Sequence, residues 1–212
     1  MEKIAIYGCG GLGREIFQMI EHINYVNKVY QFIGYFDDNI HKDTKVEKNK
    51  VIGGIKELNS YGEKLSLLIA VGDPLHIQQI HLKIKNPYIN YLNLIHPDIR
   101  IDKSDHQIGA GNIITFGCFF TTNIKIGSFN IFNTNVTLGH DVIVGSYNVL
   151  QPNVQVSGNV EIGNSNYLGV NSCILQKIII GDGNKIGAGS ILMKNITDNN
   201  TYFGNPAIKI NF

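Results

Sequence analysis

The chain has 212 residues, of which 43% are hydrophobic and 17% are charged, and its formal net charge is +1. This length allows two small domains, and the balanced charge argues against nucleic acid or an anionic membrane surface as a partner. No apolar stretch reaches a membrane-spanning length, and the first ten residues lack the pattern of a signal peptide. We therefore expect a cytoplasmic protein. Its three cysteines have no metal-ligand spacing, so we expect no metal site.

The N-terminal segment has the order strand, glycine turn, helix and strand. Residues 3–7 are an apolar run typical of a buried strand, and the glycine turn GCGGLG follows at 8–13. An amphipathic helix is predicted next, and a second strand at 32–36 ends in two acids. The inward residues of this helix are expected to be Ile16, Phe17, Met19, Ile20 and Ile23.

Gly8, Gly10 and Gly13 fit the pattern G-x-G-x-x-G, directly after a strand and at the start of a helix, with an acid about twenty residues further on. Such glycines let the backbone approach a pyrophosphate, and the N-terminus of the helix favours the anion. An NAD-dependent oxidoreductase would need a second βαβαβ half, but the sequence pattern changes near residue 100. A mononucleotide or a nucleotide sugar is therefore the favoured ligand, and a turn that binds nothing is the alternative.

The rest of this first domain is predicted to contain a strand at 65–71 that ends at Gly72, a helix at 76–85 and a short strand at 91–95. Pro87 lies between the predicted helix and the short strand, and the pair His96-Pro97 follows that strand. Because a residue before proline is biased away from helix, these prolines mark the end of the domain.

From residue 108 onward, a five-residue pattern recurs every 18 residues: an aliphatic residue, Gly, two variable residues and Asn. It begins at Ile108, Ile126, Val144, Ile162 and Ile180. The two sixth positions between successive patterns are also apolar, at Ile114, Phe120, Phe132, Leu138, Leu150, Val156, Leu168, Ile174, Ile186 and Leu192. Neither helical nor simple strand spacing produces this period, whereas hexapeptide repeats are typical of a parallel β-helix. Each coil of 18 residues is expected to have three short strands, with every sixth side chain pointing inward.

The turns of these coils are predicted from the glycine and the asparagine of each pattern. We expect the glycines to occupy sharp bends with positive φ, and the asparagines to tolerate the left-handed region and bond within their own turn. The glycines are Gly109, Gly127, Gly145, Gly163 and Gly181, and the asparagines are Asn112, Asn130, Asn148, Asn166 and Asn184.

The whole chain resembles the bacterial sugar O- and N-acetyltransferases of surface-glycan biosynthesis. The resemblance is carried by GCGGLG, GYFDD, LIHP, the hexapeptide coils and the terminal Gly204-Asn205-Pro206-Ala207, which is similar to a G-x-P-A ending. It implies an α/β + β-helix fold, with a Rossmann-like nucleotide-sugar-binding domain at 1–97 and a left-handed β-helix at 98–212. It also implies a homotrimer with acetyl-CoA, a co-substrate rather than a bound cofactor, between neighbouring prisms.

The segment NTNVTLGHD at 133–141 matches the catalytic segment of such enzymes. The resemblance implies that His140 is the general base, that Asp141 raises its basicity, and that a backbone N–H such as that of Gly158 holds the oxyanion. The chemistry requires a base, because an ammonium group must lose a proton before it attacks a thioester. A histidine of ordinary pKa, about 6.5, can accept that proton at neutral pH.

The resemblance also implies two sets of binding residues. The nucleotide sugar is expected against Gly10, Gly11, Leu12, Asp37, Asp38 and Gly72, and acetyl-CoA against the backbone around Gly158, Val170 and Ala188. Leu12 and Val149 stand where many relatives have histidine, which removes one polar contact to each substrate.

The favoured function is acetyl transfer from acetyl-CoA to the amino group of a nucleotide-linked amino-deoxysugar. Three alternatives remain: O-acetylation of a sugar of the sialic acid type, a non-catalytic trimer that binds a sugar nucleotide, and an NAD-linked oxidoreductase. The His140-Asp141 pair argues against the non-catalytic alternative.

Overall fold

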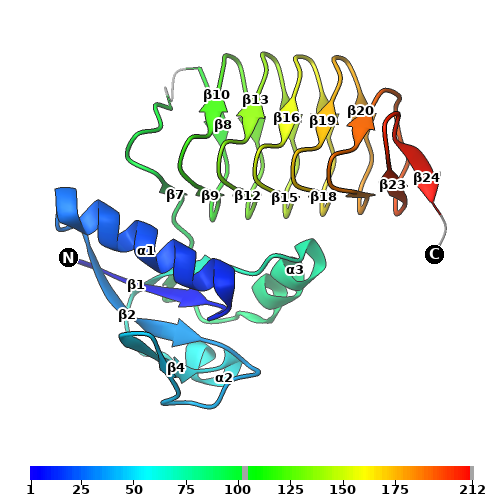
Figure 1. Ribbon diagram of the computed structural model, residues 1–212. Coiled ribbons are helices and arrows are strands. Elements are labelled where there is room, and N and C mark those ends of the chain that lie inside the picture. The colour runs from blue at the N-terminus through cyan, green and yellow to red at the C-terminus, as the bar shows by residue number, and fades with distance from the viewer. Residues whose placement is uncertain (102–104, 211–212) are drawn as a thin grey trace. The chain divides into compact units, whose positions relative to one another are not determined.

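The computed structural model describes residues 1–101 and 105–210, which form two compact units (Figure 1). The first unit consists of Met1–Gly72 and His76–Leu94, and the second consists of Asp73–Leu75 and the chain from Ile95 onward. No helix in the described part of the chain is both long and apolar enough to span a membrane.

The first unit is an α/β domain built on a six-stranded sheet with the order β3-β4-β2-β1-β5-β6. Strand β1 is central, because it pairs in parallel with both β2 and β5. The elements are β1 (Glu2–Tyr7), α1 (Gly11–Val26), β2 (Tyr30–Phe36), β3 (Lys45–Val46), β4 (Asn49–Gly53), α2 (Ile55–Asn59), β5 (Leu65–Ile69), α3 (Pro74–Lys83) and β6 (Ile89–Asn90).

The strands and helices predicted up to residue 85 are present, with small shifts in their ends. Helix α1 buries Ile16, Phe17, Met19 and Ile20 as expected, whereas Ile23 is only half-buried. The single strand predicted at 91–95 is wrong. Strand β6 ends at Asn90 and pairs with β5, whereas β7 (Leu94–Ile95) belongs to a sheet of the β-helix, so two short segments bond to different sheets.

The second unit is the expected parallel β-helix, with two-residue strands on three sheets. Their orders are β10-β13-β16-β19-β22, β20-β17-β14-β11-β8 and β24-β23-β21-β18-β15-β12-β9-β7. The strands are β8 (Gln107–Ile108), β9 (Ile113–Ile114), β10 (Phe119–Phe120), β11 (Lys125–Ile126), β12 (Ile131–Phe132), β13 (Thr137–Leu138), β14 (Ile143–Val144), β15 (Val149–Leu150), β16 (Gln155–Val156), β17 (Glu161–Ile162), β18 (Tyr167–Leu168), β19 (Cys173–Ile174), β20 (Ile179–Ile180), β21 (Lys185–Ile186), β22 (Ile191–Leu192), β23 (Thr201–Phe203) and β24 (Ile208–Ile210).

The interior of the prism is formed by the predicted sixth positions. All of them belong to one hydrophobic cluster, and only Ile108, in the first coil, is partly rather than fully buried. From β8 to β19 each strand pairs with the strand 18 residues further on, as Ile126 does with Val144. The repeat therefore sets both which side chains are buried and which residues lie in one column along the prism.

The turn chemistry differs from the expectation. Positive φ occurs two residues after the repeat glycine, as at Gly111, Phe129 and Tyr147, and not at the glycine itself. The repeat glycines are needed instead because successive coils approach closely. A Cβ on Gly127 would lie 2.6 Å from the carbonyl oxygen of Gly145.

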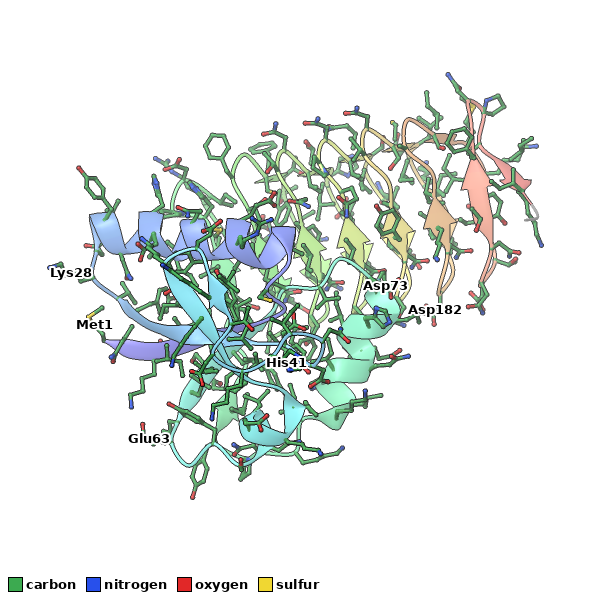
Figure 2. The ribbon with its side chains drawn as sticks, turned by 60° about the horizontal axis from the view of Figure 1, so that its bottom comes forward. Met1, Lys28, His41, Glu63, Asp73 and Asp182 are labelled. Atoms are coloured by element: carbon green, nitrogen blue, oxygen red, sulfur yellow. The ribbon has the colours of Figure 1, made fainter. Side chains whose placement is uncertain are left out.

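The repeat asparagines form a buried ladder along the prism. The Asn148 backbone N–H and Nδ2 donate to Oδ1 of Asn130 at 2.8 and 3.0 Å, and Nδ2 also donates to Gly163 O at 2.9 Å. Their bonds thus run mainly between coils rather than within one turn, which corrects the prediction. At another position of this edge Asp182, labelled in Figure 2, accepts a bond from the Asn164 N–H of the preceding coil, so this bond also joins successive coils but runs in the opposite direction.

Candidate active site

His140 and Asp141 form a hydrogen-bonded pair in the turn between β13 and β14. His140 Nδ1 lies 2.8 Å from Asp141 Oδ2, and the side chains are 50% and 44% exposed. Asp141 has φ +61°, a left-handed conformation that aspartate adopts more readily than most residues. Its backbone N–H donates to Thr122 O at 3.1 Å, so the turn is held to the preceding coil.

This pair orients the imidazole toward Gly158 in the next coil. A carboxylate at Nδ1 favours the tautomer in which Nδ1 carries the proton and Nε2 keeps its lone pair. A Cβ on Gly158 would lie 2.4 Å from Nε2, so the ring lies directly against this glycine. Within the described residues the Gly158 N–H has no acceptor. An imidazole ring therefore lies against a glycine whose N–H has no acceptor, an arrangement suited to proton removal and oxyanion stabilisation.

Two asparagines that the sequence reasoning missed flank this pair. Asn123 Nδ2 donates to Asp141 Oδ1 at 2.6 Å, and Asn159 Nδ2 lies 3.3 Å from His140 Nδ1. The hydrogen bond from Asn123, followed by that from His140, lowers the pKa of Asp141. The carboxylate therefore stays ionised as the pH falls. The 18-residue period could have predicted these neighbours, because Asn123, Asp141 and Asn159 are successive residues at that spacing and therefore lie in one column.

Two of the cysteines are poor nucleophiles. Burial raises the pKa of the Cys118 thiol to about 11, and burial together with Asp37 raises that of Cys9 to about 11. The thiolate is the reactive form of cysteine, so at neutral pH both groups are almost entirely unreactive thiols. Neither is suited to form an acyl-enzyme, in agreement with direct transfer between two bound substrates.

The residues predicted to contact acetyl-CoA lie on two different edges of the prism. Gly158 shares an edge with His140, whereas Val170 and Ala188 are successive members of a column on another edge. One ligand can contact both edges only if it extends across the face of the prism between them. Otherwise a second copy of the chain must place its Val170 edge next to the His140 edge of the first copy. Val149 lies on β15 and pairs with Ile131 and Tyr167.

The glycine loop of the first unit has two kinds of position: glycines that the fold requires, and glycines with free space where a side chain would be. Gly8 has φ +99°, and a Cβ on Gly13 would lie 2.0 Å from Gly8 O, so the fold itself requires both. A Cβ on Gly10 or Gly11 would meet nothing within 4 Å. Gly10 is the N-cap of α1, and no side chain caps this helix. The first N–H groups of α1 are therefore open to an anion at a place that packing does not reserve for glycine.

The two predicted acids after β2 have different partners. Asp37 accepts bonds from the Cys9 N–H at 3.1 Å, the Cys9 thiol at 3.3 Å and the Asn39 N–H at 2.9 Å, so it holds the glycine loop. Asp38 is exposed and accepts the Ile55 N–H, at 2.7 Å, at the start of α2, and its carboxylate also lies near enough to the Tyr7 hydroxyl to raise the pKa of Tyr7. Asp38 is therefore the acid with more free capacity for a ligand.

A pocket of about 360 Å³ opens beside these acids, at the carboxyl ends of β1 and β2. Gly8, Asp37 and Asp38 line it, but Gly10, Gly11, Leu12 and Gly72 do not. Tyr7 also lines it. Its buried hydroxyl has no partner within hydrogen-bond geometry among the described residues, and its pKa is raised by burial and, next, by the neighbouring carboxylate of Asp38. Tyr7 was missed because it reads as the last core residue of a strand.

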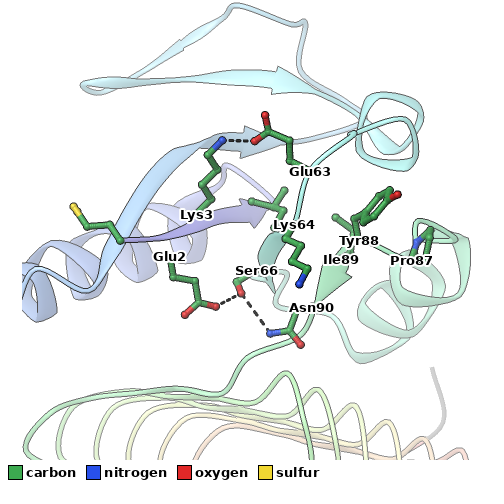
Figure 3. Close-up of a pocket in the computed structure, with 11 residues that line it drawn as sticks. Glu2, Lys3, Glu63, Lys64, Ser66, Pro87, Tyr88, Ile89 and Asn90 are labelled. Carbon is green, nitrogen blue, oxygen red and sulfur yellow. Dashed lines mark hydrogen bonds and ion pairs between the residues drawn. The ribbon is translucent and has the colours of Figure 1, made fainter.

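A larger pocket of about 720 Å³ lies at the opposite, amino-terminal ends of β1 and β5 (Figure 3). Its polar groups pair with one another: the Ser66 hydroxyl donates to Glu2, Asn90 Nδ2 lies 3.4 Å from Ser66 Oγ, and Lys3 pairs with Glu63. Ligands of parallel α/β sheets bind at the carboxyl ends of the strands. The smaller pocket is therefore the better candidate for a nucleotide.

Residues 3–84 match the family model of the PglD N-terminal domain, and no curated protein sequence matches the chain significantly. Among solved structures, a mutant of perosamine N-acetyltransferase from Caulobacter crescentus, in complex with CoA and GDP-perosamine, superposes with a TM-score of 0.89 at 22% identity, covering 100% of this chain and 98% of that one.

Two further structures cover nearly the whole of both chains. The acetyltransferase domain of PglB from Neisseria gonorrhoeae FA1090, in complex with acetyl coenzyme A, has a TM-score of 0.87 at 28% identity and covers 99% of each chain. WeeI from Acinetobacter baumannii AYE has a TM-score of 0.79 at 23% identity, over 99% of this chain and 100% of that one. The resemblance predicted from the sequence is thereby confirmed: the chain is similar, over essentially its whole length, to the hexapeptide-repeat sugar acetyltransferases of bacteria.

Proposed function

We propose that this protein is a cytoplasmic, homotrimeric enzyme that transfers the acetyl group of acetyl-CoA to the amino group of a nucleotide-linked amino-deoxysugar. The observation that carries the proposal is the arrangement of His140, Asp141 and Gly158, a charged-pair base beside a free N–H donor. The similar structures with CoA and GDP-perosamine, and with acetyl coenzyme A, support both substrate classes.

The reaction is a direct attack in three steps. His140 Nε2 takes a proton from the ammonium group of the sugar, or from the amine as it attacks, and the nitrogen bonds to the thioester carbon. The negative charge that develops on the carbonyl oxygen is stabilised by the Gly158 N–H. When the tetrahedral intermediate collapses, the carbon–sulfur bond breaks and CoA leaves as a thiolate that takes up a proton.

The nucleotide part of the sugar substrate binds to the first unit. Its pyrophosphate lies at Gly10, Gly11 and the N-terminus of α1, where the N–H groups are uncapped. Its base or ribose enters the pocket of about 360 Å³, where Asp38 and the Tyr7 hydroxyl can bond to it. Acetyl-CoA lies along the β-helix edges that carry Gly158, Val170 and Ala188.

A purified sample assayed against UDP-, GDP- and dTDP-linked amino sugars tests the activity. We expect release of CoA that depends on the amino sugar, and a product with one added acetyl group that resists hydroxylamine, since an amide resists it and an ester does not. A product cleaved by hydroxylamine would instead establish O-acetylation. Reduction of a nicotinamide cofactor without CoA release would establish the oxidoreductase alternative.

We expect the trimer to have a solution mass of about 70 kDa, from three chains of 23.5 kDa. The proposal is supported by large apolar side chains on the outer faces of the β-helix, because such residues favour burial by another subunit. Phe119 is 62% exposed, Ile179 49% and Ile143 41%. Light scattering coupled to size-exclusion chromatography measures the mass. A monomer at micromolar concentration would contradict both the trimer and a site shared between subunits.

Gly10→Val is expected to raise KM for the sugar nucleotide at least tenfold while KM for acetyl-CoA stays nearly constant. The added Cβ would meet no protein atom within 4 Å, so we expect the side chain to block the place of the pyrophosphate without disturbing the fold. Asp38→Asn keeps an acceptor for the Ile55 N–H and should raise the same KM by roughly 3- to 10-fold, as for one lost hydrogen bond.

Steady-state kinetics with each substrate varied in turn measures both effects. Gly62→Ala is the control, because its added Cβ also meets nothing within 4 Å but lies outside the loop. If Gly10→Val and Asp38→Asn both left KM unchanged, the loop would be only a turn, and the acceptor would be a small molecule held by the β-helix.

A further inference from the structure

The His140-Asp141 pair lies between two amides on the same edge of the prism. Asn123, Asp141 and Asn159 occupy equivalent turn positions in successive coils and have φ values of +53°, +61° and +55°. Asn123 touches the far oxygen of the carboxylate, Oδ1, at 2.6 Å. Asn159 touches the imidazole itself, with Nδ2 at 3.3 Å from Nδ1. One amide therefore acts on the acid and the other on the base.

The bond from Asn123 determines how the carboxylate is turned. With Oδ1 held by Asn123 and the backbone N–H held by Thr122 O, the second oxygen, Oδ2, is left facing Nδ1 at 2.8 Å. The same bond is the main reason that the pKa of Asp141 is lowered. Without it, the exposed side chain is free to rotate about its χ angles and to leave the ring.

The two neighbours of Nδ1 favour opposite tautomers of His140. The carboxylate of Asp141 accepts a proton from Nδ1 and leaves the lone pair on Nε2, over Gly158. The NH₂ group of Asn159 can bond to Nδ1 only as a donor, and so only when Nδ1 is unprotonated and the proton is on Nε2. The shorter, charge-assisted contact prevails as long as the carboxylate stays in place.

We propose that Asn123 is a positioning residue for the reaction: its amide holds the Asp141 carboxylate against Nδ1 and thereby keeps the lone pair of His140 on Nε2, against the competing donor Asn159. This inference rests on the proposed role of His140 as the base. Nε2 is the ring nitrogen that lies against Gly158, so the Nε2–H tautomer has no lone pair there with which to take a proton.

Asn123→Gly removes the amide without strain, because glycine adopts φ +53° freely. We expect kcat to fall about 10- to 30-fold, as for the loss of one charge-assisted hydrogen bond, with both KM values within about twofold. The control is Asn199→Gly, which removes an exposed asparagine with φ +56° from the edge of Asp182, outside the proposed site, and should leave kcat unchanged.

Two readouts separate positioning from a merely structural role. In ¹⁵N spectra of histidine-labelled protein, assigned with His140→Gln, the wild type should show the Nδ1–H tautomer, and Asn123→Gly should shift His140 toward Nε2–H. The acid limb of the pH–rate profile should also move to lower pH, because an imidazole that loses its carboxylate partner is less basic. Lys177 is the charged residue of this edge in the coil after Asn159. Because every variant keeps it, its charge does not contribute to the difference between the pH–rate profiles.

A second substitution tests the competition directly. Asn159→Asp, added to Asn123→Gly, replaces the competing donor by an acceptor near Nδ1 and should recover at least a third of the lost kcat. The proposal is overturned if Asn123→Gly matches Asn199→Gly in rate and tautomer, or if it loses activity with an unchanged tautomer and no recovery. An inactive wild type with the expected tautomers would refute the proposed function, while the spectra would still test the role of Asn123.

Discussion

Replacing His140 with alanine is expected to lower kcat by about 10²–10⁴, with little change in KM for acetyl-CoA. The reason is that the variant keeps the backbone of the turn, held by Thr122 O and by the Asn159 N–H, but lacks the group that takes the proton from the amine. The measurement is steady-state kinetics with an amino-sugar nucleotide at saturating acetyl-CoA.

The control for this variant is His41→Ala, which removes an exposed histidine of the first unit and should leave the rate unchanged (Figure 2). If His140→Ala kept more than about half of the wild-type rate, His140 would be an ordinary turn residue and the mechanism given above would be wrong.

Asp141→Asn should cost less than the loss of the base and should move the acid limb of the pH–rate profile to lower pH. Asn123 and His140 lower the pKa of Asp141, so its carboxylate stays charged at neutral and mildly acidic pH. Removing that negative charge makes the imidazole less basic, and a lower pH is then needed to protonate it. An acid limb that stayed in place would show that Asp141 has no electrostatic effect on the base.

Gly158→Ala is the second change for which we expect a large effect, a fall in kcat of about 10²-fold. The new Cβ would lie 2.4 Å from Nε2 of His140 and 2.6 Å from Cε1, so the ring must move away from the place where the amine and the thioester meet. Because that ring is half-exposed, it can rotate outward, and the melting temperature should change by only a degree or two.

The contrast between activity and stability identifies the cause of this effect. Gly62→Ala should change neither the rate nor the melting temperature, since its Cβ has open space around it. If Gly158→Ala kept the wild-type rate, the ring position over Gly158 would not be the reactive one. If the variant instead unfolded, the expectation that the ring can rotate outward without loss of stability would be wrong.

The period of the sequence determined the β-helix and its interior. In a coil with one inward side chain every six residues, the place of a residue in the repeat determines whether its side chain points inward. The buried positions of the prism therefore follow from the spacing alone. The adjacent pair His140 and Asp141 was equally accessible, because neighbours in the chain cannot be far apart. The short elements β3, β4 and α2 were missed because Lys45–Asn59 has little apolar periodicity.

What a residue touches was decided only by the tertiary structure. The sequence marks four glycines of one loop alike, yet packing requires Gly8 and Gly13 and leaves Gly10 and Gly11 open. The sequence assigns Asp37 and Asp38 the same role, yet only Asp37 accepts a hydrogen bond from the glycine loop. Likewise the repeat asparagines bond between coils and are not turn residues. The physical reason is that a local pattern sets the direction of a side chain, whereas its hydrogen-bond partners and the space beside it depend on segments brought together by folding.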